Sequence, residues 1–553
     1  MVVGWGRTVL PEVIIDATHE GDLAVWAGAP YRVGREPRSR LEPHAGSIYF
    51  YDRTGEILHG STGQGDRAVV SYGCRLTIQN YSDREYPAHA LASPPPGYKK
   101  ADYEHSAYDT AEYNPNGKLE MNMYPFGSEV QEANWLWPES SRAERARLYE
   151  IYKNHALGFL YHLQHERGYK VGLPRDDYTD NGYVPYRLYV REARRIMGDY
   201  VMSEPDINPY LVGHSLIQPV KEDSVAIGHY PLDSKPFYLK TNVAMPDKGN
   251  GNFYINSTMP FQVPYRSLVP QQVEGLLVAT AISATHVAYS AVRMDPTWMV
   301  MGQAAGIAAA LAVKQHLSVR QVPFDSIQRE LLKQKCKVMF YWDLPADHKA
   351  FSAIQWLSVR KVVKGYPDRL FRPDQNLSRA ELAGLLVKAF DVWPSVSNEH
   401  FKDVPYLHPA FRHVESLYDN GVLQVFGMEP LWRMFGSWDE QASRNVGYEQ
   451  DFGFRQFLPE KEVNWRELTG AIHILQARRK MSPLQEGDAT LIPPAPDPVV
   501  WAKKVLMGST FSRDYGARQF GPGDPVTRAA AAALIASLMD QTPDMQPSAA
   551  AGN

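Results

Sequence analysis

The sequence predicts two regions of different fold class, an α/β (α+β) domain over residues 1–335 and an all-α domain of three repeats after residue 341. The first region mixes β-branched runs, aromatic-rich loops and a few clear helical periodicities. In the second region a Phe-x-Pro turn followed by a helix recurs three times, aligned without gaps on Phe371, Phe457 and Phe520. Self-similarity of this kind predicts stacked units that bury their apolar faces together.

Composition narrows the class of protein. The 553 residues are 44% hydrophobic and 22% charged, which predicts a soluble globular chain with more than one core. A net charge of -4 gives no general electrostatic reason to bind nucleic acid or an anionic membrane. The two cysteines, Cys74 and Cys336, argue against a disulfide framework, although one bridge stays open. No metal site is expected, because no metal-ligand motif or cluster is present.

No targeting or membrane segment is expected either. The opening MVVGWGRTVL has no adequate apolar stretch for a secretory signal. The most apolar segment, Met299 to Val313, is too short and too rich in Gly and Ala to span a bilayer.

The first region contains three segments with clear local signals. Near the start, the strand residues Val13 to Ile15 run into IDATHEGD and then a helix. A helix over Pro138 to Gly168 has a capping box made by Ser141 and Glu144. Further on, Leu276 to Val278 reads as a buried strand.

The segment after this third strand predicts a helix that packs closely against a neighbour. We expect Asp295 to be its N-cap and Pro296 its first residue. Gly302 and Gly306 follow along one side, where they leave room for a close contact. The positive N-terminal end of such a helix suits a phosphate or another electron-rich group.

Together these motifs closely resemble the bacterial FAD-dependent oxidoreductase family. The matching stretches are IDATHEGD, LYVREARRIMG, VPYRSLVP and LLVATAISATH followed by SAVRMDPTWMVMGQAAG. The resemblance implies FAD as cofactor and a fold in which the first strand lies near the adenosine side. It implies catalytic roles for His286 and Arg293. It also implies cofactor contacts from Ala17, Thr18, Glu20, Gly21, Asp22, Ala279, Thr280, Ser283, Gln303 and Ala304.

Each of these roles has a plainer alternative. His286 can move a proton or hydrogen-bond flavin, but a lone histidine is often a satisfied structural residue. Arg293 can offset the charge of reduced flavin or anchor a substrate carboxylate, or it can form an ion pair with a nearby acid. Glu20-Gly21-Asp22 can hold ribose hydroxyls or cap the helix that follows.

The sequence also departs from the family pattern. No GxGxxG turn is present to hold the pyrophosphate; Gly4-Trp5-Gly6 echoes it, but Val9 stands where the third glycine belongs. We therefore expect an N-terminally truncated member of the family that binds FAD poorly or not at all. Thr280 replaces a family glycine, and Lys235 replaces the histidine of a typical DSH.

The three repeats resemble surface-layer homology (SLH) modules, by which bacterial surface proteins hold secondary cell-wall polymers. We place them at 341–398, at 399–482 with an insertion near 424–455, and at 495–541, followed by a disordered tail at 542–553. The resemblance is carried by GYPD, FRPDQ and SRAEL in the first copy, and it implies polymer contacts from Ser378, Arg379, Thr527 and Arg528. A Ser-x-x-Glu stretch is also simply a helix capping box, so a scaffold role stays open.

The sequence therefore predicts an FAD-dependent oxidoreductase of the bacterial cell envelope or exterior, tethered by SLH-like repeats. The alternative is a non-catalytic envelope scaffold or polymer-binding protein with a decayed flavin domain. Neither interpretation identifies the small-molecule substrate or the electron acceptor.

Overall fold

The computed structural model describes residues 2–4, 7–9, 11–104, 110–121, 129–130, 132–209, 219–237, 249–256, 258–396, 399–428, 456–480, 497–509, 512, 516 and 519–541. The chain divides into two compact units, Met1–Ile327 and Gln328–Asn553. Helix α8 (Phe324–Lys333) contains the point of division. The mixture of helices and strands confirms an α/β class for the first region.

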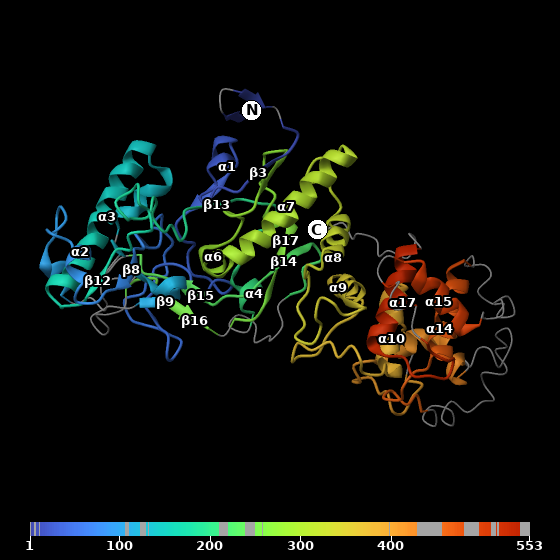
Figure 1. Cartoon of the computed structure of the whole chain (residues 1–553). Helices are drawn as coiled ribbons and strands as arrows, with labels where there is room; N and C mark the ends of the chain where they lie inside the picture. The colour runs from blue at the N-terminus through green and yellow to red at the C-terminus, as the bar shows by residue number, and fades with distance from the viewer. Residues whose placement is uncertain are drawn as a thin grey trace. The chain divides into compact units, whose positions relative to one another are not determined.

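A parallel pair of strands forms the centre of one part of the first unit (Figure 1). Strand β3 (Ile14–Asp16) pairs with β18 (Leu276–Val278), so that two segments far apart in the sequence lie side by side. Helices α1 (Asp22–Trp26) and α7 (Asp295–Gln315) pack against this pair, and α6 (His286–Val292) lies between β18 and α7 in the sequence. Ala24, Ile196, Leu276 and Val278 form its buried core.

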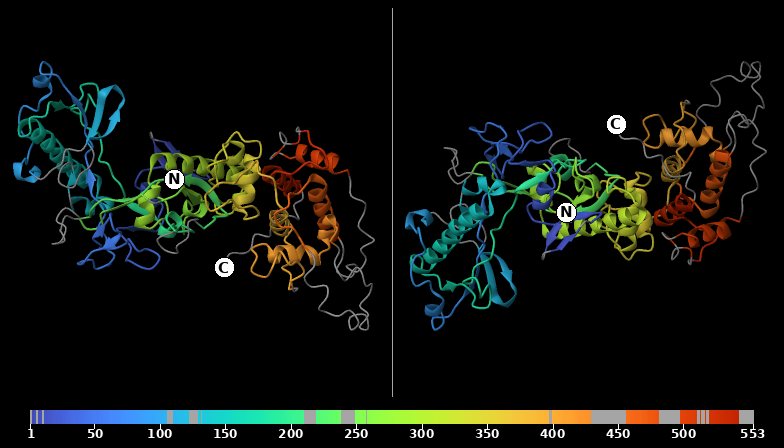
Figure 2. Two further views of the ribbon diagram at one scale, coloured as in Figure 1. Left: turned by 90° about the horizontal axis from the view of Figure 1, so that it is seen from below. Right: turned by 90° about the horizontal axis from the view of Figure 1, so that it is seen from above.

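A four-stranded antiparallel sheet and a long helix form the other main core of this unit. The strand order is β12 (Val171–Gly172), β8 (Thr77–Asn80), β10 (Lys118–Met121) and β9 (Thr110–Asn114). Helix α3 (Arg142–His165) begins where the Ser141 side chain accepts a hydrogen bond from the Glu144 backbone, as the capping sequence predicts. The two views of Figure 2 show α3 beside this sheet.

The remaining strands of the unit form antiparallel pairs. These are β1 (Val2–Gly4) with β2 (Arg7–Val9), β4 (Tyr31–Val33) with β13 (Arg194–Ile196), β5 (Phe50–Tyr51) with β6 (Glu56–Ile57), β7 (Tyr72–Gly73) with β11 (Glu129–Val130), β14 (Ser224–Gly228) with β17 (Phe261–Pro264), and β15 (Leu232–Ser234) with β16 (Phe253–Ile255). The short helices are α2 (Tyr86–His89) and α4 (Glu204–Ile207). Gly4 therefore belongs to a hairpin strand, while Trp5 and Gly6 lie outside the described residues.

Helix α7 differs from its sequence-based prediction in two ways. Its N-cap is Met294, whose backbone is extended, and both Asp295 and Pro296 belong to the first turn. Asp295 still places a carboxylate at the positive end of the helix. In addition, α7 has 21 residues and meets a length-and-composition test for a membrane-spanning helix, and 33% of its apolar stretch is buried inside the protein. The same test is met by core helices of soluble proteins, so this is weak evidence.

The second unit is built from pairs of helices. They are α9 (Phe351–Val359) and α10 (Arg379–Ala389), α11 (Phe411–Asp419) with the 3-10 turn η5 (Val422–Phe426) and α14 (Trp465–Lys480), and α15 (Pro498–Met507) and α17 (Arg528–Gln541). The second helix of each repeat packs on the first helix of another, α10 on α11, α14 on α15 and α17 on α9. An all-α domain stays a prediction, because 429–455 and 481–496 lie outside the described residues, as does the expected tail at 542–553.

A ring of three backbone hydrogen bonds joins the repeats. Leu377 donates to Val526, Val526 to Val463 and Val463 to Leu377, at distances of 2.7, 2.9 and 2.9 Å. Each bond comes from the residues just before the second helix of a repeat. The three helix starts are therefore held by one another in a closed, pseudo-threefold arrangement.

Candidate functional site

The loop after β3 is closed by two side chains of the IDAT segment. The Asp16 carboxylate accepts hydrogen bonds from the backbone of Thr18 and Ala24, both at 2.8 Å. The Thr18 hydroxyl accepts from the backbone of Asp22, also at 2.8 Å. These bonds satisfy N–H groups at the start of α1, which have no partner inside the helix. Asp16 and Thr18 are therefore the side-chain caps, whereas Gly21 is an N-cap without a side chain, at φ 69°.

The β3 loop and the segment after β18 are in direct contact. The Thr280 hydroxyl donates to the backbone oxygen of Thr18 at 2.6 Å, and the Ala279 N–H donates to that of Asp16 at 3.0 Å. A Cβ atom at Gly21 would lie 3.0 Å from the Cβ of Ala281. The structure therefore brings these sequence-predicted residues together. The Thr280 hydroxyl makes a hydrogen bond here that a glycine could not make.

The carboxylates of Glu20 and Asp22 are already engaged. The indole N–H of Trp137 donates to Glu20 at 2.9 Å, and Arg145 lies 3.3 Å from the same carboxylate. Arg194 forms an ion pair with Asp22 at 2.7 Å. A ribose at this loop would compete with these bonds for the same oxygens.

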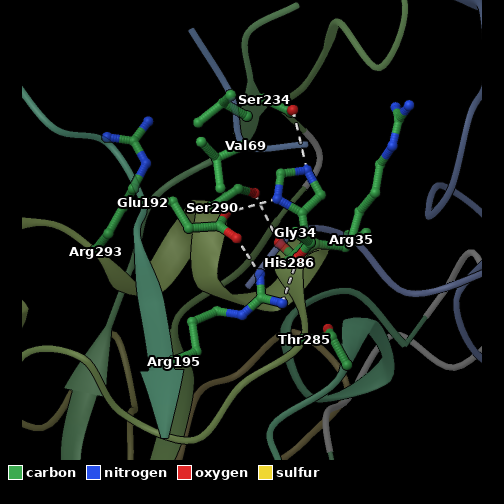
Figure 3. A network of polar contacts seen from close by, with 12 residues as sticks. Gly34, Arg35, Val69, Glu192, Arg195, Ser234, Thr285, His286, Ser290 and Arg293 are labelled. Atoms are coloured by element: carbon green, nitrogen blue, oxygen red, sulfur yellow. Dashed lines mark hydrogen bonds and ion pairs between the residues drawn. The ribbon is translucent and has the colours of Figure 1, made fainter. Parts of the chain in front are cut away.

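The imidazole of His286 lies at the centre of a buried polar network (Figure 3). Its Nδ1 is 2.6 Å from a Glu192 carboxylate oxygen, and its Nε2 is 3.1 Å from the Ser234 hydroxyl. Its backbone N–H donates to Glu36 at 2.9 Å. Arg195 is paired with Glu192 and reaches Glu36 at 3.1 Å. We call these five residues the histidine network.

Charges inside the histidine network stabilise one another. Burial opposes the charge on Arg195, but Glu192 and Glu36 outweigh it, and the pKa of Arg195 lies above its usual value. Burial would raise the pKa of Glu36, but the Arg195 charge and the His286 N–H hold it below its usual value. The ionised Glu36 and Arg195 therefore form a fixed frame around the imidazole.

The network has the order of a serine–histidine–carboxylate relay. The Glu192 carboxylate contacts Nδ1 of the imidazole, and the Ser234 hydroxyl contacts the opposite nitrogen. Ser234 and His286 are each only 1% exposed, and the rings of Phe237 and Phe253 pack on the imidazole. Because a nucleophile needs access to its substrate, this arrangement suits holding or moving a proton rather than covalent catalysis.

Arg293, at the end of α6, makes the ion pair that the sequence left as an alternative. Its guanidinium lies 3.1 Å from the Asp233 carboxylate and 3.4 Å from the Tyr189 hydroxyl. Burial opposes its charge, but Tyr189 and Asp233 raise the pKa of Arg293 above its usual value. Arg191 lies 3.7 Å from the same carboxylate, and burial and the Arg293 charge lower its pKa. Asp233 and Ser234 are neighbours on β15, so one strand contacts both Arg293 and His286.

A second pair of carboxylates lies beside the start of α6. The Glu204 backbone N–H donates to Glu42 at 2.9 Å, and His44 contacts the Glu204 carboxylate at 2.5 Å. Burial raises the pKa of Glu42 to about 8, and the charges of Glu204 and Glu36 act in the same direction. Thr285, the N-cap of α6, hydrogen-bonds to Glu42 and opposes the shift. Glu42 is therefore mostly protonated at pH 7.

Some of the residues present fit bound FAD and others do not. On α7, Gln303 is exposed, Ala304 is buried, and a Cβ at Gly302 or Gly306 would meet nothing within 4 Å, so this face is open. The Ser283 hydroxyl is fully buried and has no hydrogen-bond partner among the described residues. An open glycine face and an unsatisfied buried hydroxyl fit a flavin. The engaged Glu20 and Asp22 do not fit a ribose.

Sequence motifs did not predict a role for four residues of the network, which are Glu36, Glu192, Arg195 and Ser234. They are separated from His286 by 250, 94, 91 and 52 residues, so no local periodicity connects them. The one available signal was the charge in LYVREARRI, where charged side chains interrupt an otherwise apolar segment. In the structure this segment contributes to both places, because Arg194 contacts Asp22 while Glu192 and Arg195 are members of the histidine network.

In the second unit the predicted polymer-binding arginines lie at contacts between repeats. Arg379 donates to the Phe457 carbonyl at 2.9 Å and pairs with Glu467 at 3.4 Å. Arg528 donates to the Phe371 carbonyl at 2.9 Å and pairs with Glu381. Both side chains are at least nine-tenths buried.

Ser378 and Thr527 are helix caps. Ser378 and Glu381 form the capping box that the sequence offered as the plainer interpretation, and the Thr527 hydroxyl accepts from the Ala530 backbone at 3.1 Å. The four residues therefore lie at the joints of the ring and form hydrogen bonds inside the protein, although the buried Nε of Arg379 has no hydrogen-bond partner among the described residues.

Comparison with known proteins agrees with this division of the chain. No curated protein matches the sequence. Residues 3–331 match the family described as FAD dependent oxidoreductase, and residues 341–383 match the S-layer homology domain. Since the first match covers more than half of the sequence, the chain belongs to the FAD dependent oxidoreductase family, and its first match is followed by an S-layer homology domain.

Proposed function

We propose that this protein is an FAD-dependent oxidoreductase of the bacterial cell envelope, attached there by its C-terminal repeats. Family membership supports the reaction class, and the S-layer homology domain supports the location. The structural observation that carries the proposal is the histidine network. It holds a titratable imidazole in a fixed orientation directly after the β18 segment, and Tyr289 of α6 donates to the Thr280 carbonyl of that segment at 3.3 Å.

When bound, FAD supplies the two-electron chemistry of the reaction. The protein's own residues have the tasks of orientation and proton management. Glu192 holds the proton on Nδ1 of His286, which leaves Nε2 as the nitrogen that exchanges a proton through Ser234. The ion pair of Arg293 with Asp233 fixes β15 against α6 and so keeps Ser234 in place. Gly302, Gln303 and Gly306 of α7 form the open face for the cofactor.

The experiment is an FAD titration of the purified 553-residue chain, followed by absorbance and flavin fluorescence. A pyrophosphate anchor contributes hydrogen bonds to charged oxygens of roughly 1.5–3 kcal/mol each. Without two such bonds, binding weakens by about 10²–10⁴-fold. We therefore expect a colourless protein that binds added FAD weakly but saturably. A tight yellow complex would contradict the weak-binding prediction and support the enzyme, whereas no binding at millimolar FAD would contradict the enzyme.

The role of His286 needs a matched pair of variants. His286→Asn removes the buried imidazole, and His316→Asn removes an exposed one at the end of α7. If His286 transfers a proton, turnover with a substrate found by screening falls by about 10²–10⁴-fold in His286→Asn. We expect His286→Asn to keep the FAD affinity of the unchanged chain, and His316→Asn to keep both its FAD affinity and its turnover. Equal turnover in all three proteins would assign His286 a structural role only.

A non-catalytic envelope scaffold is the second candidate, and one observation favours it. The ring nitrogens of His286 and the oxygens of Glu20 already have partners inside the chain. Polymer retention without FAD binding in the same preparation would select this alternative.

A further inference from the structure

The turn between β9 and β10 contains an asparagine followed by a glycine. The two strands pair antiparallel, and Pro115, Asn116 and Gly117 form the turn between them. Asn116 has φ 68° and ψ 25°, a left-handed conformation that asparagine tolerates better than most residues, and Gly117 has φ 71°. Both residues are exposed. The peptide bond that joins them is therefore open to water at one end of the hairpin.

The dipeptide Asn-Gly occurs four times in the sequence, and the structure holds three of the four asparagine side chains. The amides of Asn181 and Asn420 donate to backbone carbonyls, both at 2.8 Å. Asn250 is fully buried, and its side-chain oxygen accepts from Arg35 at 2.7 Å. These three side chains must break a hydrogen bond before they can turn toward the following residue. The four pairs begin at Asn116, Asn181, Asn250 and Asn420.

Asn116 differs from the other three. Its side chain forms no hydrogen bond or ion pair among the described residues. A Cβ atom at Gly117 would have nothing within 4 Å, so there is space for the turn to rotate. The side-chain amide of Gln79 donates to the backbone oxygen of Asn116 at 3.3 Å. This bond polarises the peptide and makes the N–H of Gly117 easier to deprotonate. An accessible, polarised backbone nitrogen thus follows a carboxamide that nothing holds.

We propose that Asn116 is a site of spontaneous deamidation. The Gly117 nitrogen attacks Cγ of Asn116 and loses its proton, and the side-chain nitrogen leaves as ammonia. The product is a five-membered succinimide ring, which water opens. Cleavage of the bond to Cγ gives aspartate, and cleavage of the bond to the main-chain carbonyl gives isoaspartate. Glycine favours the first step, because it has no side chain to shield its nitrogen.

The reaction has a consequence for the four-stranded sheet. Both products add a carboxylate, but isoaspartate also adds a methylene to the backbone. The longer backbone comes just before Lys118, which pairs with Asn114 of β9 and with Gln79 of β8. Strand β10 lies between these two strands. We therefore expect isoaspartate to weaken the pairing of β10 at this end of the sheet.

Peptide mass spectrometry of the purified 553-residue chain, incubated at pH 8, measures the reaction. We expect the Asn116 peptide to gain about 1 Da. This should occur at least about tenfold faster than at the other three pairs, whose side chains are held. In urea the fold is lost, and all four pairs should react at similar rates. Equal rates in the folded chain would overturn the proposal. So would an unchanged Asn116 in a folded chain whose unfolded form reacts.

A matched pair of variants gives an independent readout. Asn116→Gln keeps a carboxamide but would need a six-membered ring, and Asn181→Gln makes the same change at a held side chain. Ion exchange separates the product by its additional negative charge. We expect this acidic form to accumulate in the unchanged chain and in Asn181→Gln, but not in Asn116→Gln. An acidic form that accumulates equally in Asn116→Gln would overturn the proposal.

Hydrogen exchange of the separated isoaspartate form tests the effect on the sheet. The reference is Asn116→Asp, which has the same charge and a normal backbone. Peptides from β10 should exchange faster in the isoaspartate form, whereas peptides from α7 should exchange equally in both proteins. Equal exchange of β10 would overturn the predicted loss of pairing.

Discussion

Replacing Glu42 by glutamine should remove a pH dependence from the stability of the first unit. Glu42 is 6% exposed, and burial beside Glu204 raises its pKa from 4.5 to about 8. The folded protein therefore holds a proton that the unfolded chain releases near pH 4.5. The contribution of Glu42 to the free energy of unfolding is fully present below pH 4.5 and is lost as the pH rises through about 8.

The magnitude follows from the size of the shift. A shift of about 3.5 pH units at 1.36 kcal/mol per unit gives a loss of about 5 kcal/mol at most between pH 4.5 and pH 8. Glutamine has the shape of the protonated acid but no proton to lose. We therefore expect Glu42→Gln to match the unchanged chain at pH 5 and to be more stable by a few kcal/mol at pH 9.

Urea unfolding at several pH values measures this effect. Because the chain has two units, hydrogen exchange in peptides from α4 and α6 should be used to follow the first unit alone. Glu56→Gln changes an exposed carboxylate in β6 and serves as the control. If Glu42→Gln and the unchanged chain lose stability in parallel between pH 5 and pH 9, Glu42 is ionised in the folded protein and the reasoning is wrong.

Two further substitutions test packing at the two candidate sites. Gly21→Ala should destabilise the first unit more than Gly28→Ala: both residues have positive φ, but only Gly21 would place its Cβ 3.0 Å from another side chain. The expected difference is about 1 kcal/mol or more by urea unfolding, and equal losses would mean that the contact relaxes freely. Arg528→Ala should destabilise the second unit by about 3 kcal/mol, because it removes the positively charged partner of Glu381 and the donor to two carbonyls. Arg466→Ala, at an exposed position, should change unfolding little, and a similar loss in both variants would exclude a special role for the buried pair.

Local signals in the sequence predicted the elements that position the site. The capping sequence at Ser141 and the apolar run Leu276–Val278 both produced the expected element. The IDAT segment was correctly read as a strand followed by a helix. These features depend on neighbours within a few residues, which is why one sequence suffices to find them.

The polar network of the site could not be predicted from such local signals. His286 depends on Glu36, Glu192 and Ser234, which come from separate strands or loops. Burial of so many charged groups is explained only by their mutual pairing, and pairing is a property of the folded chain. The cap of α1 shows the same limit on a smaller scale. The Glu20-Gly21-Asp22 stretch directly before and at the helix start was a candidate for the cap, but the capping acceptors are Asp16 and Thr18, which lie further back in the sequence.

In the repeats, two differences between the copies, at Trp465 and at Ala530, alter a single joint of the ring. In two joints of the ring an arginine meets a glutamate of another repeat, Arg379 with Glu467 and Arg528 with Glu381. At the third joint the arginine position is held by Trp465, whose ring stacks on Phe520 at 4.0 Å.

In the third repeat, Ala530 occupies the position that Glu381 and Glu467 hold in the other two. A glutamate at this position would face an arginine placed where Trp465 is. A carboxylate retained there would have faced an indole and lacked its partner, at a cost that grows with burial. Losing both charges together leaves a joint that aromatic stacking stabilises instead. The ring can therefore close at all three joints with two kinds of contact. Trp465, which replaces the arginine in the second repeat, and Ala530, which replaces the glutamate in the third, therefore belong to the same interface.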